Sequence, residues 1–101
     1  MNLDEIGGYG QHHVVTALVG QGFQCRRSTK PRGANDIKAR KSKQNRLVQV
    51  RTFLKPSDIS AAEKEKLMAR AEKLGYEAWV AEVEVDETGV QVGRIIWTRM
   101  T

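Results

Sequence analysis

Two segments of the chain carry apolar residues at helical spacing. Between residues 11 and 21 these positions form one stripe, so we predict a helix there that ends at Gly22. A second helix is predicted to begin at residues 56–58 and to end before Gly75, which occupies the place of a C-terminal cap. The glycines within residues 7–10 lead us to expect a loosened N-terminus ahead of the first helix.

Shorter segments alternate apolar and polar residues, as half-buried strands do. The five predicted strands are 23–28, 36–40, the segment around 47–50, 77–85 and 90–98. The segment around Leu47, Val48 and Val50 is the richest in apolar residues, so we expect it to be central. Polar residues 41–45 and 86–89 predict hairpin turns. The resulting order, α-β-β-β-α-β-β, predicts an α/β domain with a mixed sheet flanked by helices.

Size and composition indicate one ordinary globular domain over residues 1–101, with 40% hydrophobic and 29% charged residues. No apolar run approaches the ~20 residues needed to span a bilayer, which argues against a membrane protein. Residues 1–5 lack the basic and then apolar pattern of a secretory signal. The single cysteine, Cys25, cannot form an internal disulfide. We interpret it as a small apolar residue on a buried strand and expect a cytoplasmic protein.

The positive charge is concentrated in the middle of the chain. The net charge is +5, yet residues 24–55 hold eleven Lys and Arg against one acid, Asp36, and so carry +10. Residues 56–101 hold six bases and nine acids and carry −3. A basic middle beside a mildly acidic remainder is typical of a surface that binds nucleic acid. The alternative interpretation is a solvated, lysine-rich loop.

The bases of this segment follow the predicted strands and turns. Lys38 and Arg40 share one face of their strand, opposite the apolar Ile37 and Ala39. Phe53, near the end of this segment, is the only aromatic residue among residues 24–55. So few aromatic residues argue against stacking of single-stranded bases and favour contacts with a duplex or branched-duplex backbone. The bases that we expect to contact DNA are Arg26, Arg27, Lys30, Arg32, Lys38, Arg40, Lys41, Lys43 and Arg46.

Three polar residues have the spacing of a metal-dependent nuclease centre. In such centres an Asp ends one strand, and an acid-x-Lys triplet lies on the next. Here Asp36 is present, but Gln49 stands in place of the second acid and Arg51 in place of the Lys. Mg²⁺ needs anionic oxygen ligands beside the phosphate, so Asp36 and Gln49 predict at most a weak site for Mg²⁺ or Mn²⁺. Arg51 can pair with a phosphate but cannot carry a proton.

Several short motifs occur in an order that matches one known family. They are a first helix ending at Gly22-Phe23, then Arg27-Ser28, Asn35-Asp36-Ile37, Val48-Gln49-Val50-Arg51, a long helix ending at Lys73-Leu74-Gly75, Trp79-Val80-Ala81 and Ile95-Ile96-Trp97. Over residues 10–97 the chain resembles the archaeal-type Holliday junction resolvases of the PD-(D/E)xK, restriction-endonuclease-like nuclease superfamily. The resemblance implies the fold of that superfamily, binding to DNA and a homodimer.

The resemblance also implies a role for individual positions. Gln11 matches the Glu of the family's first helix, Asp36 its metal-binding Asp, Gln49 its second acid and Arg51 its catalytic Lys. Arg27-Ser28 matches an Arg-Ser pair that lies near the phosphate. Asn35 replaces the Pro that usually precedes the Asp. Glu has become Gln twice and Lys has become Arg once, so polarity is retained while negative charge or proton chemistry is lost. Such changes favour binding of DNA without metal.

Other residues are weaker candidates for chemistry. Glu5 is a possible substitute acid, one to two turns before Gln11. His12 and His13 are interpreted as surface or phosphate-contacting residues, because adjacent helical residues point about 100° apart and make a poor pair of metal ligands. The tryptophans of the predicted strands are expected to pack in the core or in a dimer interface, with stacking on bases as the alternative. These residues are Trp79 and Trp97.

The sequence therefore predicts a nucleic-acid-binding protein with a nuclease-like fold and an impaired or lost phosphodiesterase centre. The first alternative is an active junction resolvase or structure-selective endonuclease, which would use Asp36, Gln49 and Arg51 with Mg²⁺ or Mn²⁺. The second alternative is a non-catalytic scaffold that binds a protein partner through its sheet edge or dimer face.

Overall fold

The computed structural model describes residues 3–27, 36–54 and 61–101. Some predictions fall on the remaining residues and lie outside the described part of the chain. They concern the DNA contacts of Ser28, Lys30 and Arg32 and the start of the second helix at residues 56–58.

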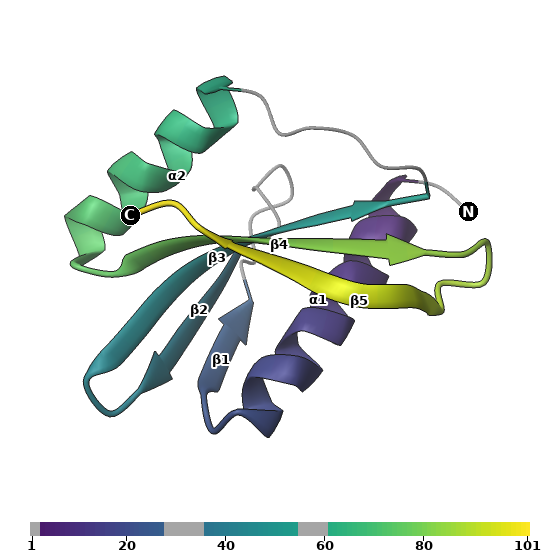
Figure 1. Ribbon diagram of the computed structural model, residues 1–101, viewed down its shortest axis with the longest axis horizontal. Coiled ribbons are helices and arrows are strands. Elements are labelled where there is room, and N and C mark those ends of the chain that lie inside the picture. Colours follow the sequence, from purple (N-terminus) through teal and green to yellow (C-terminus); the bar gives the residue numbers. More distant parts are fainter. Residues whose placement is uncertain (1–2, 28–35, 55–60) are drawn as a thin grey trace.

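The order of elements is the predicted one, α-β-β-β-α-β-β (Figure 1). The elements are α1 (Leu3–Gly20), β1 (Gln24–Arg27), β2 (Asp36–Lys41), β3 (Gln44–Phe53), α2 (Ala61–Leu74), β4 (Glu77–Val85) and β5 (Gln91–Arg99). The five described strands form one sheet in the order β1-β2-β3-β4-β5, so the predicted central position of β3 is confirmed. Among the described strand pairs only β3–β4 is parallel, and α2 lies in the crossover that such a pair requires.

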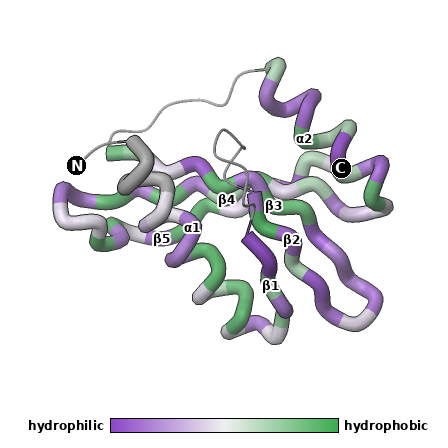
Figure 2. The backbone as a smooth tube through the Cα atoms, turned by 180° about the vertical axis from the view of Figure 1, so that it is seen from behind, coloured by the Kyte–Doolittle hydropathy of each residue, from purple (hydrophilic) through white to green (hydrophobic). Residues whose placement is uncertain are grey.

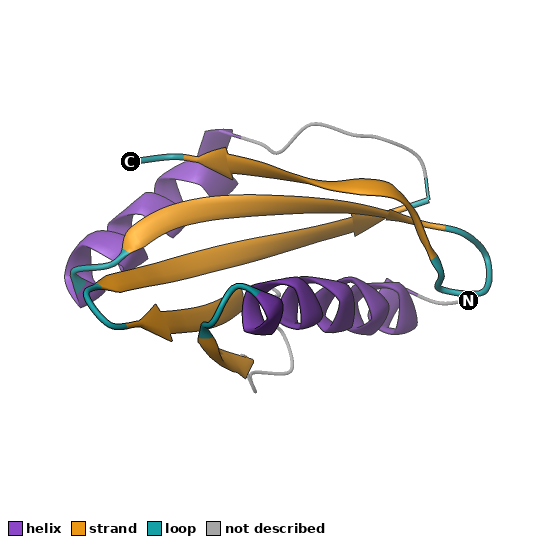
Figure 3. Cartoon of the chain, turned by 60° about the horizontal axis from the view of Figure 1, so that its bottom comes forward, coloured by secondary structure: helices purple, strands orange, loops and turns teal. Residues whose placement is uncertain are grey.

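The two helices cover opposite faces of the sheet (Figure 3). Successive residues of β3 point alternately to these faces. Val48 and Val50 join the core beneath α1, together with Val14 and Leu18 of that helix. Leu47 joins the smaller core beneath α2, with Leu67, Ala71, Ala78 and Val80. We call these two sides the α1 face and the α2 face.

Three residues of uncertain role in the sequence pack against the core of the α1 face. Trp79 and Trp97 both do so, which confirms the expectation of core packing for these side chains. Cys25 is half-buried against the same core. Burial raises the pKa of the Cys25 thiol above its ordinary value, because the thiolate would lose hydration there.

The N-terminal helix begins eight residues earlier than the sequence predicts. The structure places residues 3–20 in α1, so the expectation of a loosened segment over residues 7–10 is wrong. Gly10 is buried, and a Cβ added to it would lie only 2.7 Å from the Cβ of Thr52 on β3. Close approach of helix and strand therefore accounts for this glycine, although glycine is a poor helix former.

Both helices end as predicted at a glycine with positive φ. Gly22 has φ 96°, and the amide of Phe23 donates to the carbonyl of Leu18 at 3.0 Å. Gly75 has φ 68°, and the amide of Tyr76 donates to the carbonyl of Ala71 at 2.9 Å. These bonds satisfy carbonyls that the end of a helix leaves unpaired. Within the described part of the chain, no helix is long and apolar enough to cross a membrane.

The predicted turn between β4 and β5 is organised by one carboxylate. Asp86 accepts hydrogen bonds from the Thr88 hydroxyl at 2.6 Å, the Thr88 amide at 2.8 Å and the Val90 amide at 3.1 Å. These bonds hold the pKa of Asp86 below its ordinary value, because they favour the ionised form. The imidazole of His13 on α1 lies 2.9 Å from the carbonyl oxygen of Gly89 and so links the helix to this turn.

Candidate functional site

Three of the predicted centre residues lie together on the α2 face. Asp36 opens β2 and is the direct antiparallel partner of Gln49 on β3. Directly opposed residues point to the same face, and Arg51 follows two positions later on β3, so it shares that face. Asp36 and Gln49 are 3% and 8% exposed. The β2–β3 pairing thus brings an acid, an amide and a guanidinium to one side of the sheet.

Helix α2 contributes two charged residues that sequence reasoning missed. The guanidinium of Arg70 forms an ion pair with Oδ2 of Asp36. The amide of Gln49 donates to Oε2 of Glu63 over 3.4 Å. Glu63 and Arg70 are seven residues apart, or about two helical turns, so they lie on the same side of α2. Leu67 lies between them in the sequence and is buried against the sheet. Its apolar side chain is the signal in the sequence that could have indicated this side of the helix.

The fourth predicted centre residue lies on the other helix. Gln11 is a half-buried residue of α1, adjacent to Gly10, whose Cα is close to Thr52. Because α1 covers the opposite face of the sheet, Gln11 is not on the α2 face with Asp36 and Gln49. Glu5, the substitute acid considered from sequence, also belongs to α1. Any role of either residue in the centre stays a prediction.

Three exposed bases share the α2 face beside β1 and β2. Arg26 is the direct partner of Lys38, and Arg40 lies two residues further along the same strand. Among the described elements α2 packs against β3 and β4, so it leaves this part of the sheet open. Figure 2 shows hydrophilic colouring along β1 and the β2–β3 hairpin. We call Arg26, Lys38 and Arg40 the basic face.

The other described bases of this region lie elsewhere. Strand alternation assigns Arg27 and Lys41 to the α1 face, and Lys43 lies in the exposed turn between β2 and β3. The ammonium of Lys41 donates to the carbonyl of Gln21 at 2.7 Å and lies 5.5 Å from the centre of the Phe23 ring. Lys41 therefore secures the turn between α1 and β1.

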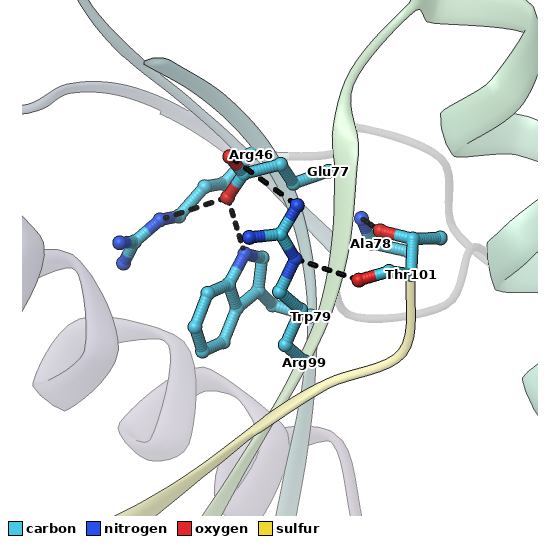
Figure 4. Close-up of polar contacts among 6 residues, drawn as sticks. All are labelled: Arg46, Glu77, Ala78, Trp79, Arg99 and Thr101. Atoms are coloured by element: carbon cyan, nitrogen blue, oxygen red, sulfur yellow. Dashed lines mark hydrogen bonds and ion pairs between the residues drawn. The ribbon is translucent and has the colours of Figure 1, made fainter.

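Arg46 has a structural role that the sequence analysis did not anticipate. Its guanidinium lies over the rings of Phe23 and Trp79, at 4.8 and 4.4 Å from their centres. Its Nε lies 3.7 Å from Oε1 of Glu77, which also accepts a hydrogen bond from the Trp79 indole at 2.9 Å (Figure 4). Arg99 approaches the other oxygen of Glu77 at 3.8 Å.

These contacts argue against a role of Arg46 in binding DNA, and that role stays a prediction. Its side chain is 15% exposed, and it is stacked on the α1 face, opposite the basic face. The stacking and the ion pair stabilise the packing of Phe23 and Trp79, so the positive charge of Arg46 is used inside the domain. The sequence places Arg46 close to the other bases of this segment. The pairing of Arg46 with Ala39, which puts it on the α1 face, is known only from the register of β2 and β3.

The described residues around Asp36 do not suit Mg²⁺ or Mn²⁺. These ions prefer several anionic oxygen ligands, whereas Asp36 is paired with Arg70 and has the uncharged Gln49 as its partner across the strands. Among the residues whose side chains the structure describes, no group of three or more His, Cys, Asp or Glu could hold a metal ion.

Comparisons with known proteins agree with this architecture. The chain matches no family model and no curated protein. Among solved structures it is similar to Hjc of Archaeoglobus fulgidus, described as a Holliday junction resolvase from an archaeal hyperthermophile. The likeness covers 93% of this chain and 72% of that chain, with a TM-score of 0.76 and 20% sequence identity. The chain thus has an archaeal-type, resolvase-like nuclease fold.

Proposed function

We propose that the chain binds duplex or branched DNA through its nuclease-like fold and has an impaired or lost metal-dependent phosphodiesterase centre. The observation that supports this most directly is the basic face, where three exposed bases lie on the same face of the sheet as the buried Asp36–Gln49 pair. Like charges directly opposite each other, as in Arg26 and Lys38, lower the stability of a sheet. Binding of backbone phosphates gives a reason to place them there.

Loss of efficient cleavage follows from the chemistry of the three central residues. Gln49 offers no negative charge to a metal ion, and Arg51 stays protonated, so it cannot replace a lysine in proton transfer. Retention of Asp36, buried beside Gln49, favours the alternative function of an atypical endonuclease that uses Mg²⁺ or Mn²⁺. The two functions differ in whether a divalent ion is needed at all.

Binding and cleavage assays separate these functions. Labelled four-way junction and linear duplex are incubated with the protein in EDTA and, separately, in Mn²⁺. We expect gel retention in EDTA that weakens with salt, with a log-log slope of about −5 if roughly six phosphates are contacted. Nicking in Mn²⁺ that disappears in Asp36→Ala would instead establish the endonuclease. Absence of binding to either DNA at low salt would contradict both functions and leave the scaffold.

We also propose that the chain forms a homodimer and acts in the cytoplasm. Strand β5 is an edge of the described sheet and bears the exposed apolar residues Val92 and Ile96. A second copy of the chain that covered them would remove apolar surface from water. Sedimentation equilibrium is expected to give twice the 11.4 kDa of the chain, and Ile96→Lys is expected to lower this mass. A single-chain mass at ~100 µM, far above common dimer dissociation constants, would contradict the dimer.

A further inference from the structure

The ion pair between Asp36 and Arg70 occupies the position where a nuclease of this fold would need a metal ion. We infer that Arg70 replaces the divalent ion as the counter-charge of Asp36, and that Arg70 and Arg51 together bind a backbone phosphate without metal. The first part concerns the protein alone. The second part rests on the proposed function, since it names the chemical group that the site would hold.

Burial makes a counter-charge at Asp36 necessary. An ionised carboxylate that is 3% exposed is strongly disfavoured unless an opposite charge and hydrogen bonds compensate it. Arg70 is the compensating group that the structure supplies, and it comes from α2, not from the sheet. In a metal-dependent centre the ion would fulfil this role, so Arg70 and a divalent ion are alternatives at the same carboxylate.

The local charges leave little reason for an ion to bind. Asp36 already has Arg70 as its ion-pair partner, and Gln49, its partner across the strands, adds no negative charge that would hold a divalent ion. The ion would also have to approach the guanidinium of Arg70 or displace it from Oδ2. Both carboxylate oxygens of Asp36 are buried without a hydrogen-bond partner among the described residues, so the ion pair with Arg70 is the compensation that the structure shows. Without Arg70, both oxygens of Asp36 would lack compensation.

The position of Arg70 also suits a phosphate. Its side chain is 47% exposed although it reaches a buried carboxylate, so Arg70 lies at the border between the buried pair and solvent. A guanidinium has five N–H donors in a planar fork and can serve a carboxylate and a phosphate at once. Arg51 approaches from β3 on the same face, and the basic face continues along β2 from Asp36. A DNA backbone on that face would pass from the exposed bases to these two guanidinium groups.

Binding of Mn²⁺ to the protein in the absence of DNA tests the first part. Free Mn²⁺ is measured by electron paramagnetic resonance, and thermal unfolding is followed with and without 1 mM Mn²⁺. We expect no specific site in the wild type and none in Lys66→Gln, which removes one exposed positive charge from the same helix. Arg70→Gln is expected to gain one Mn²⁺ site and a rise in Tm with Mn²⁺. Both effects should disappear in Asp36→Asn/Arg70→Gln.

Two outcomes would overturn this inference. One is a stoichiometric Mn²⁺ site in the wild type that depends on Asp36. The other is a folded Arg70→Gln protein that binds no Mn²⁺. If Arg70→Gln is unfolded in EDTA, Mn²⁺ is expected to restore its circular dichroism, and failure to do so would count equally against the inference.

The phosphate is tested separately with a linear duplex in EDTA. Arg70→Gln is expected to weaken binding by about tenfold at 0.1 M salt, as the loss of one phosphate contact does, and Lys66→Gln by less than threefold. Equal affinities of the two variants would overturn the phosphate contact. If the wild type binds no duplex, the proposed function fails, while the Mn²⁺ measurements still decide the role of Arg70.

Discussion

Arg26→Ala/Lys38→Ala is expected to weaken duplex binding by roughly 60-fold at 0.1 M salt, because each phosphate contact contributes a factor of about eight there. The slope of log K against log salt should become less steep by about 1.8. Both side chains are exposed and lie directly opposite each other on the open α2 face, where one DNA backbone can reach them together. Titration of a fluorescent duplex at several salt concentrations measures both quantities.

The stability of this variant distinguishes a binding role from a structural one. Two like charges opposed across strands repel each other, so their removal is expected to leave Tm unchanged or slightly raised. Lys64→Ala/Arg94→Ala lowers the net charge by the same two units from α2 and β5 and is expected to retain most of the affinity. Equal losses in the two variants would mean that only total charge matters, and the basic face would then not be the binding surface.

Gly10→Val is expected to lower the free energy of unfolding by about 3 kcal/mol, the upper range for overpacking of a core. A Cβ at position 10 would lie 2.7 Å from the Cβ of Thr52, and that atom is fixed to the β3 backbone. Helix α1 would have to move away from the sheet, and its contacts through Val14 and Leu18 would loosen. The corresponding fall in Tm is roughly 12–24 °C for a domain of this size.

The same helix offers a matched control for this prediction. A Cβ added at Gly8 meets nothing within 4 Å, so Gly8→Ala is expected to raise stability by up to about 1 kcal/mol through helix propensity. Urea unfolding of the two variants and of Gly10→Val/Thr52→Ala gives the energies. The double variant should recover part of the loss, since Thr52 is the residue that clashes. A Gly10→Val protein as stable as the wild type would contradict the close approach of α1 and β3.

Local patterns in the sequence were sufficient for most of the fold. Alternation identified β2, β3 and β4, and glycines with positive φ marked the ends of α1 and α2. The start of α1 was predicted wrongly, because glycine in a helix is locally unfavourable and its benefit at position 10 depends on Thr52, 42 residues away in the chain. Such long-range contacts leave no periodic signal.

The candidate site was predicted in part for the same reason. The tight turn between β2 and β3 makes Asp36 and Gln49 partners, so their proximity follows from two adjacent strands. Arg70 and Glu63 reach the site only because α2 packs across β3 and β4. In the sequence, Glu63 and Arg70 look like ordinary surface charges of a helix. Their partners, Gln49 and Asp36, are determined only by the packing of α2 on the sheet.

The sequence by itself determined the order of elements, the central position of β3 and the concentration of positive charge before residue 56. Those properties depend on neighbouring residues, whose spacing along the chain already contains the relevant geometry. The tertiary structure decided which charges serve the interior and which remain on the surface. Arg46 stacks on two aromatic rings and Arg70 neutralises a buried acid, because strand register and helix packing determine which partner each charge has.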